Sequence, residues 1–216
     1  MNRAFSETPM NPHRTMSRFA ATVLFTTISF ALAAVAVGCG GGSDSTTSSG
    51  PVATFTPDPP APSAGTIALL AGSSNGTSVD VRVTVTEVPG FFGAAFRIDY
   101  DTNALLFNGM TDSGSFLRVG VTDPSQLFFD ANATSQPGSV VITATRFYPA
   151  VPVPGAATGD LVVLNFIARV PIAAGAAAGR LKFDSSGRRV CNGTVAPPDC
   201  AEIVVTWSSG GGVSAQ

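Results

Sequence analysis

The chain has 216 residues with a formal net charge of −2, and only 12% of its residues are charged. Because no basic stripe is visible, the sequence argues against nucleic-acid binding, which rests on a surface that neutralises phosphates. The one histidine, His13, lies in a segment that we expect to be removed on export, so the mature chain would lack histidine-dependent catalysis and histidine-ligated metals. The 23 glycines, 16 prolines and many short apolar alternations favour a single all-β domain rich in turns.

Residues 19–37 form an uncharged apolar segment that follows Arg14 and Arg18 and ends at Gly38 and Cys39. A basic region, an apolar core and small residues in this order are typical of an export signal. The cysteine directly after Gly38 makes the segment resemble a bacterial lipoprotein signal. That resemblance implies a signal peptide over 1–38, with lipidation of Cys39, whose acyl chains would anchor the protein firmly. The alternative is an uncleaved transmembrane helix, for which about 20 apolar residues suffice.

Met16 is an alternative start, because the residues before it make the leader unusually long. In a bacterium with two membranes, Gly40 stands where an aspartate usually retains lipoproteins at the inner membrane. We therefore expect an exported protein that is anchored to a bacterial membrane, at the outer membrane or cell surface in such an organism. Residues 39–64 are rich first in Gly and Ser and then in Pro, which predicts a tether that begins flexible and stiffens.

Short alternating apolar runs over 65–208 predict a two-sheet β-sandwich of about nine strands, with a disordered tail at 209–216. The clearest alternation places four valines of 78–88 on one face and polar residues on the other, as in a strand with one face in water. The expected strands begin near 66, 78, 92, 105, 126, 140, 160, 180 and 202, with a weaker one near 116.

The central unit is FGAAFRIDYDTNALLFNGMT, over 92–111, which predicts a strand, a tight Asp/Asn turn and a second strand. Together with Val88-Pro89-Gly90 before it, the order FRIDYD then LLFNGM resembles consecutive strands of a cohesin domain. The resemblance covers about 65–207. It implies a jelly-roll topology related to carbohydrate-binding modules, and a non-catalytic receptor for dockerin domains.

In that family one flat sheet face holds the partner, with an asparagine and an aspartate on the strand that corresponds to 92–100. The matching positions here are Gly93 and Ala95, which offer no polar side chain. Arg97 and Asp99 still face outward in the predicted strand. The resemblance therefore implies a candidate partner face at Gly93, Ala95, Arg97 and Asp99, for a protein partner that is either dockerin-bearing or different.

Exposed aromatic side chains suggest an alternative function, because flat sugar rings stack on them. Tyr148 and Trp207 are the main candidates for sugar stacking, and Phe91, Phe128 and Phe147 also lie at strand ends or beside another aromatic residue. The competing interpretation is that one of each adjacent pair fills the core. The alternative function is thus a polysaccharide-binding surface module of the same architecture.

Cys191 and Cys200 remain once Cys39 is assigned to lipid, and an even pair in an exported protein predicts a disulfide. A metal site built from two thiolates without histidine is the weaker interpretation.

The run from Asp99 to Asn103 begins like a calcium-binding loop, but Ala104 and Met110 stand where the loop needs glycine and glutamate. A polar turn is the better interpretation. Calcium elsewhere stays conceivable, although no ligands can be assigned and no cofactor is predicted. The spacing singles out no catalytic pair of carboxylates, so we expect no enzyme.

Overall fold

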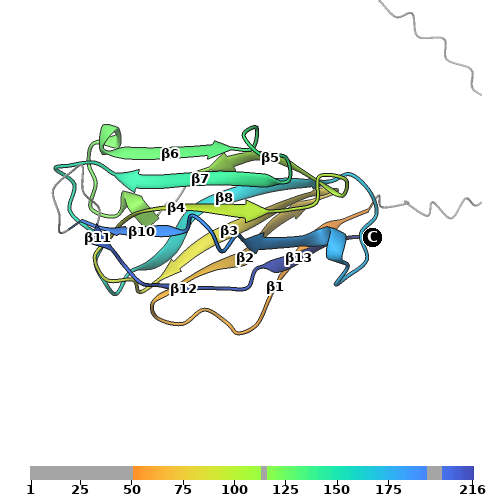
Figure 1. The fold of residues 1–216 in the computed structure, drawn as a ribbon, viewed down its shortest axis with the longest axis horizontal. Coiled ribbons are helices and arrows are strands. Elements are labelled where there is room, and N and C mark those ends of the chain that lie inside the picture. Colours follow the sequence, from red (N-terminus) through yellow and green to blue (C-terminus); the bar gives the residue numbers. More distant parts are fainter. Residues whose placement is uncertain (1–50, 113–115, 194–200) are drawn as a thin grey trace, which may run out of the picture. The chain divides into compact units, whose positions relative to one another are not determined.

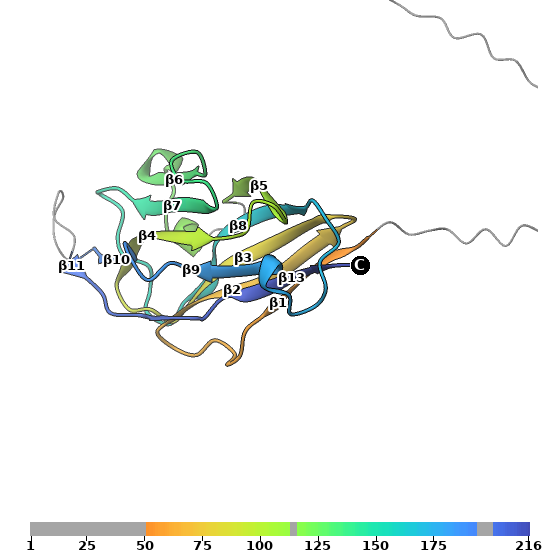
Figure 2. The ribbon, with the colours of Figure 1, turned by 45° about the vertical axis from the view of Figure 1, so that its right-hand side comes forward.

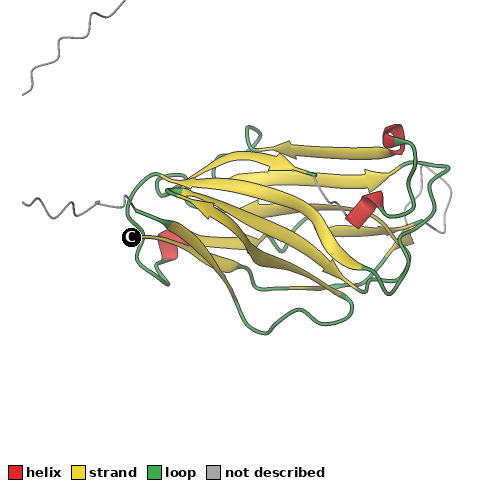
Figure 3. Ribbon diagram, turned by 180° about the vertical axis from the view of Figure 1, so that it is seen from behind, coloured by secondary structure: helices red, strands yellow, loops and turns green. Residues whose placement is uncertain are grey.

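The computed structural model describes residues 51–112, 116–193 and 201–216, and its described part consists of β-strands, three 3-10 turns and loops (Figures 1 and 3). None of its helices is long and apolar enough to cross a membrane. The strands, in chain order, are β1 (Ala53–Pro57), β2 (Thr66–Asn75), β3 (Ser78–Thr86), β4 (Phe91–Asp99), β5 (Leu105–Thr111), β6 (Leu127–Asn132), β7 (Ser139–Arg146), β8 (Thr158–Ala168), β9 (Arg180–Phe183), β10 (Arg189–Asn192), β11 (Ala201–Glu202), β12 (Thr206–Trp207) and β13 (Gly211–Ala215). The 3-10 turns are η1 (Phe116–Arg118), η2 (Pro124–Gln126) and η3 (Ala177–Gly179).

The strands form two sheets that face each other, and Figure 2 shows β4 and β9 of one sheet in front of β2 and β3 of the other. The larger sheet has the order β1-β13-β9-β4-β10-β11, and β7 joins it at β4 and carries β6. The smaller sheet has the order β12-β2-β3-β8-β5. This is the all-β, two-sheet sandwich with jelly-roll topology that the sequence predicted.

Alternation along the strands builds one core between the sheets. The predicted inward valines of β3, from Val79 to Val85, are all at most 1% exposed. In β4, Phe96 and Ile98 face the same core, which confirms the alternation predicted for the central strand. Both faces of this core come from residues that recur at every second position, as a sandwich requires.

Both ends of the domain extend beyond the predicted limits. The predicted tail contains β13, and the predicted tether contains β1, which pairs with β13 in antiparallel register. A side chain at Gly211 would lie 2.1 Å from the ring of Phe55, so glycine here permits a close approach of two strands. Val213 and Ala215 alternate inward at 1% exposure. The Gly-rich end that predicted disorder is therefore an ordered strand.

Three further features of the structure differ from the sequence prediction. Residues expected as a weak strand from 116 form the turn η1, because Phe116 and Leu117 are consecutive and both buried, which a strand with one wet face does not allow. The last expected strand is split into β11 and β12. The strand β10 was not expected, because its only fully buried side chain is Val190 and it shows no alternating run.

Candidate functional site

The strand β4 lies inside the larger sheet, where it pairs with β7, β9 and β10. Because Ala94, Phe96 and Ile98 point into the core, the alternate side chains of β4 point to the outer surface. The four residues of the predicted partner face, Gly93, Ala95, Arg97 and Asp99, are these alternate residues. The structure thus brings all four together on one face, which we call the outer β4 face.

Strand register extends the outer β4 face across β6, β7 and β10, since directly opposed residues share a face. Its successive cross-strand rows are Phe128–Thr145–Gly93–Cys191, then Asp130–Thr143–Ala95–Arg189, then Asn132–Val141–Arg97. Asp99 lies opposite Lys182 of β9 at the end of the face. The neighbours of β4 in these rows were not predicted, because no local pattern gives the pairing of distant strands.

Gly93 and Ala95 give the centre of the outer β4 face no long side chain from β4, and we call this part the shallow centre. A Cβ atom at Gly93 would lie 2.4 Å from Oγ1 and 2.6 Å from Cβ of Thr145, so glycine is required by the packing of β7. Ala95 adds only a methyl group beside Thr143. The polar pair of the cohesin pattern is therefore replaced by a shallow surface, and at position 93 the packing itself excludes a larger side chain.

Charged groups lie at the edges of this shallow centre. Arg97 donates from Nη1 to Asp184 at 3.2 Å, while its buried Nε makes no hydrogen bond within the described residues. The backbone N–H and the hydroxyl of Ser186, together with the charge of Arg97, lower the pKa of Asp184. One nitrogen of the Arg97 guanidinium group is thus buried without a hydrogen-bond partner among the described residues.

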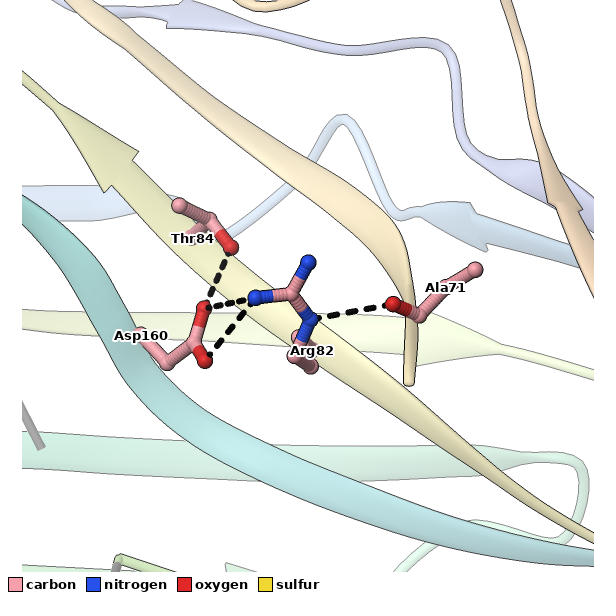
Figure 4. Close-up of polar contacts among 4 residues, drawn as sticks. All are labelled: Ala71, Arg82, Thr84 and Asp160. Atoms are coloured by element: carbon pink, nitrogen blue, oxygen red, sulfur yellow. Dashed lines mark hydrogen bonds and ion pairs between the residues drawn. The ribbon is translucent and has the colours of Figure 1, made fainter. Parts of the chain in front are cut away.

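The outer face of the smaller sheet differs, because its polar side chains bond to one another. Figure 4 shows Arg82 donating from Nε to the carbonyl of Ala71 at 3.0 Å and from Nη1 to the carboxylate of Asp160. Thr84 donates to the same carboxylate at 2.7 Å. Asn165 donates to Asp80 at 2.7 Å in a second such group. These polar side chains of the smaller sheet are thus bonded to neighbours on the same sheet.

The aromatic candidates for sugar binding separate into exposed and packed side chains. Tyr148 is 78% exposed, with Phe147 at 47% and Phe128 at 42%. Trp207 instead packs on the core, with its ring 4.9 Å from that of Phe183 and the Arg188 guanidinium 5.6 Å away. The candidate Phe91 is fully buried, so its expected exposure was wrong. Tyr148 keeps its place as a candidate, and the packing of Trp207 argues against a stacking role.

Arg146 is an unexpected feature of β7, because it is only 1% exposed. Its guanidinium donates to the carbonyl oxygens of Leu117, Val119 and Val151, and burial lowers its pKa. These bonds join η1 and the loop after β7 to the strand. The alternation of Val140, Ile142 and Ala144 places position 146 inward and was the signal that could have revealed it.

The structure tests the cysteine and calcium predictions only in part. Cys191 on β10 is disulfide-bonded, whereas Cys200 and Cys39 lie outside the described residues, so the predicted pairing and lipidation stay predictions. Oδ1 of Asp101 accepts from the backbone N–H of Asn103 at 2.9 Å, as in a polar Asx turn. Within 51–112, 116–193 and 201–216, no group of three or more acidic, Cys or His side chains could hold a metal ion.

Comparison with known proteins gives one family match, to the cohesin domain, over residues 66–187. A Clostridium acetobutylicum cohesin, CaCohA2, solved with CaDoc0917, is 25% identical over 68% of this chain and 94% of its own, with a TM-score of 0.49.

Two further cohesins are each 18% identical, with a TM-score of 0.49. The sixth cohesin of Acetivibrio cellulolyticus scaffoldin B, in complex with a Cel5 dockerin, aligns over 73% of this chain and 96% of its own. The Clostridium thermocellum OlpA cohesin, in complex with Doc918, aligns over 68% and 96%. No curated protein matches.

Proposed function

Because the chain belongs to the cohesin domain family, we propose that it is a non-catalytic module that binds a protein partner on the outer β4 face. The observation that carries the proposal is the contrast between the two outer surfaces. On the smaller sheet the side chains of Arg82 and Asn165 bond to neighbours on the same sheet, whereas the outer β4 face combines a shallow centre with Arg97, Asp99 and Arg189 at its edges. Protein interfaces are enriched in arginine and aromatic residues.

A dockerin-bearing protein is the partner that the cohesin resemblance implies, and it is the partner class that we propose. The contacts would differ from the family pattern, since Gly93 and Ala95 have no polar group to offer. Charged contacts fall instead to Arg97, Asp99 and the exposed Arg189 at the edges of the shallow centre. This arrangement supports a specificity that is distinct from that of cohesins with the asparagine and aspartate.

We propose further that the module is exported and lipid-anchored at Cys39, on the outer membrane or cell surface of a bacterium with two membranes. Since β1 begins at Ala53, the tether shortens to residues 40–52. A flexible chain of that length has an end-to-end distance of roughly 20 Å. Such a tether would hold the sandwich near the membrane while leaving it free to rotate toward a partner.

The binding proposal is tested by capture from the exported proteins of the source organism, using the purified full-length chain with and without calcium. We expect retention of a protein that carries a dockerin domain, followed by direct binding of that purified protein. Failure to retain any dockerin-bearing protein would contradict the proposed partner class. Turnover of a glycoside by the chain would contradict a non-catalytic role.

Anchoring is tested by Cys39→Ser in the native host. We expect metabolic labelling with a fatty acid in the wild-type chain and its loss in C39S, which should leave the membrane fraction, because several acyl chains would be missing. Cys191→Ser serves as the matched control and should keep the label. Membrane association of C39S equal to that of the wild type would favour a transmembrane segment instead.

A further inference from the structure

The strand β6 is an edge of the larger sheet, since among the described strands it pairs only with β7. Its outward side chains are Phe128, Asp130 and Asn132, and all three are exposed. Alternate residues on one strand lie about 7 Å apart. The edge therefore presents an aromatic ring, a carboxylate and an amide in one line.

Two more rings stand beside this line, where the chain leaves β7. Phe147 and Tyr148 follow Arg146 directly, and the ring of Phe147 lies 6.2 Å from that of Phe128, tilted by 50°. With 78% of its surface exposed, Tyr148 is the most exposed aromatic residue of the described chain. Exposed rings that gather at one place are typical of a binding surface.

Hydrogen bonds hold the backbone of the loop that carries Phe147 and Tyr148. The N–H of Phe147 donates to the carbonyl of Gln126 at 2.7 Å, which ties the first ring to the start of β6. The buried guanidinium of Arg146 holds the carbonyl of Val151 on the far side of the same loop. A loop fixed in this way loses little conformational entropy when a ligand binds.

The polar side chains of the edge keep free bonding capacity. Within the described residues, the carboxylate of Asp130 makes no hydrogen bond or ion pair. Asn132 accepts through Oδ1 from Thr134 and Ser135, which leaves both hydrogens of its amide nitrogen available. The edge thus offers an acceptor and two donors next to three apolar ring faces.

We propose that Phe128, Asp130, Asn132, Phe147 and Tyr148, which we call the β6 edge site, bind a neutral polysaccharide. A sugar ring has an apolar face of C–H groups that can stack on aromatic rings, and hydroxyl groups that can bond to Asp130 and Asn132. An apolar partner would bury the Asp130 carboxylate without compensation, which disfavours such a partner. The same carboxylate opposes acidic glycans and nucleic acids.

The test is native gel electrophoresis of the full-length chain in non-ionic detergent, with a polysaccharide cast in the gel. The probes are hydroxyethylcellulose, xylan, mixed-linkage glucan and galactomannan, with polygalacturonate as the acidic comparison. We expect at least one neutral probe to slow the wild-type chain. Tyr148→Ala and Asp130→Ala should each weaken that binding at least about tenfold, which corresponds to ~1.4 kcal/mol.

Leu106→Ala is the matched control, because Leu106 is an apolar side chain 39% exposed on β5 of the other sheet. It should leave the retardation unchanged, and circular dichroism should show that every variant is folded. Unchanged mobility in all four neutral probes would overturn the proposal, as would full retardation of folded Y148A and D130A. Dockerin capture by Y148A reports on the protein partner alone, because Tyr148 lies outside the rows of the outer β4 face. Asp130 lies in one of those rows, so D130A is judged by the gel assay only.

Discussion

Gly93 is the residue that most constrains the proposed partner face. The Cβ atom that any substitution adds would lie 2.4 Å from Oγ1 of Thr145, so the two strands would have to shift. We expect Gly93→Ala to lower the free energy of unfolding by about 1–3 kcal/mol, in line with overpacking elsewhere. Denaturant unfolding measures the change, with Ala95→Ser as the control at the next outward position. A stability of G93A equal to that of A95S would contradict the close packing of β4 on β7.

Arg146 gives a second prediction, because its charge is buried and, among the described residues, its guanidinium bonds to carbonyl oxygens. Arg146→Met should remove these buried hydrogen bonds and cost on the order of 3 kcal/mol. Arg118→Met is the matched control: Arg118 is 46% exposed and pairs with Asp112, so its loss should cost less than about 1 kcal/mol. Chemical denaturation measures both variants, and an equal loss of unfolding free energy would contradict this prediction.

These two residues show what a sequence can predict about single positions. The facing of Arg97 and Asp99 follows from period-two alternation within one strand, and the structure confirms it. The requirement for glycine at 93 depends on Thr145, which lies 52 residues away and is brought close only by the pairing of β4 with β7. The hydrogen bonding of Arg146 depends likewise on carbonyl groups that lie outside its own strand.

The pair of β1 and β13 carries the prediction that concerns whole strands. Val213 is 1% exposed in β13, so Val213→Asp would place a charge in the core and should destabilise the domain by several kcal/mol. Ser214→Ala removes only an exposed hydroxyl contact with Thr54 and should cost less than about 1 kcal/mol. Thermal unfolding compares the two variants. Equal unfolding temperatures for the two variants would indicate that β13 is a disordered tail, as its glycines suggested.

The bidentate pair of Asp58 and Arg180 links the end of β1 to β9, with one of its two bonds at 2.7 Å. Hydrogen bonding to Arg180 lowers the pKa of Asp58, and the same bonds raise the pKa of Arg180. Since the pKa of Asp58 is lower in the folded chain, its stabilisation is complete above the ordinary carboxyl pKa of about 4 and is lost as the pH falls through the folded value.

Asp58→Asn should therefore lower stability at neutral pH by about 0.5–1 kcal/mol, as expected for a partly exposed pair, and the difference from the wild type should shrink in acid. Unfolding free energies at pH 7, 5 and 3 provide the measurement. Arg180→Met removes the same pair from the other side and should follow the same course. A difference that grows on acidification would contradict the sign of the shift.

Among whole elements, the sequence predicted best those strands that bury one face alone. β3, β4 and β8 have long alternating runs, and each was located to within a few residues. β1 and β13 were missed because Thr, Pro and Gly carry little hydrophobic signal, and both strands depend on pairing between distant parts of the chain. The assignment of η1 as a strand failed because two adjacent buried residues fit a tight turn as well as a strand end.

For the molecule as a whole, the two outer surfaces are chemically unlike. On the outer surface of the smaller sheet, polar side chains form ion pairs and hydrogen bonds with one another. The outer β4 face has a shallow centre, charged groups at its edges and aromatic side chains at β6. The sequence predicted the sandwich, because it depends on repeated local patterns, and the family, because the runs FRIDYD and LLFNGM resemble cohesin strands. The extension of the face to β6 and β10 could not be predicted, since it depends on sheet order.

The account rests on the claim that the outer β4 face holds the protein partner, and one titration tests it most directly. The captured dockerin-bearing protein is titrated calorimetrically into the wild-type chain, into Ala95→Arg and into Thr111→Arg, which places the same side chain on an exposed residue of β5 in the other sheet. We predict at least about a hundredfold weaker binding for A95R, or ~2.7 kcal/mol, and wild-type affinity for T111R. Wild-type affinity for folded A95R would contradict the account.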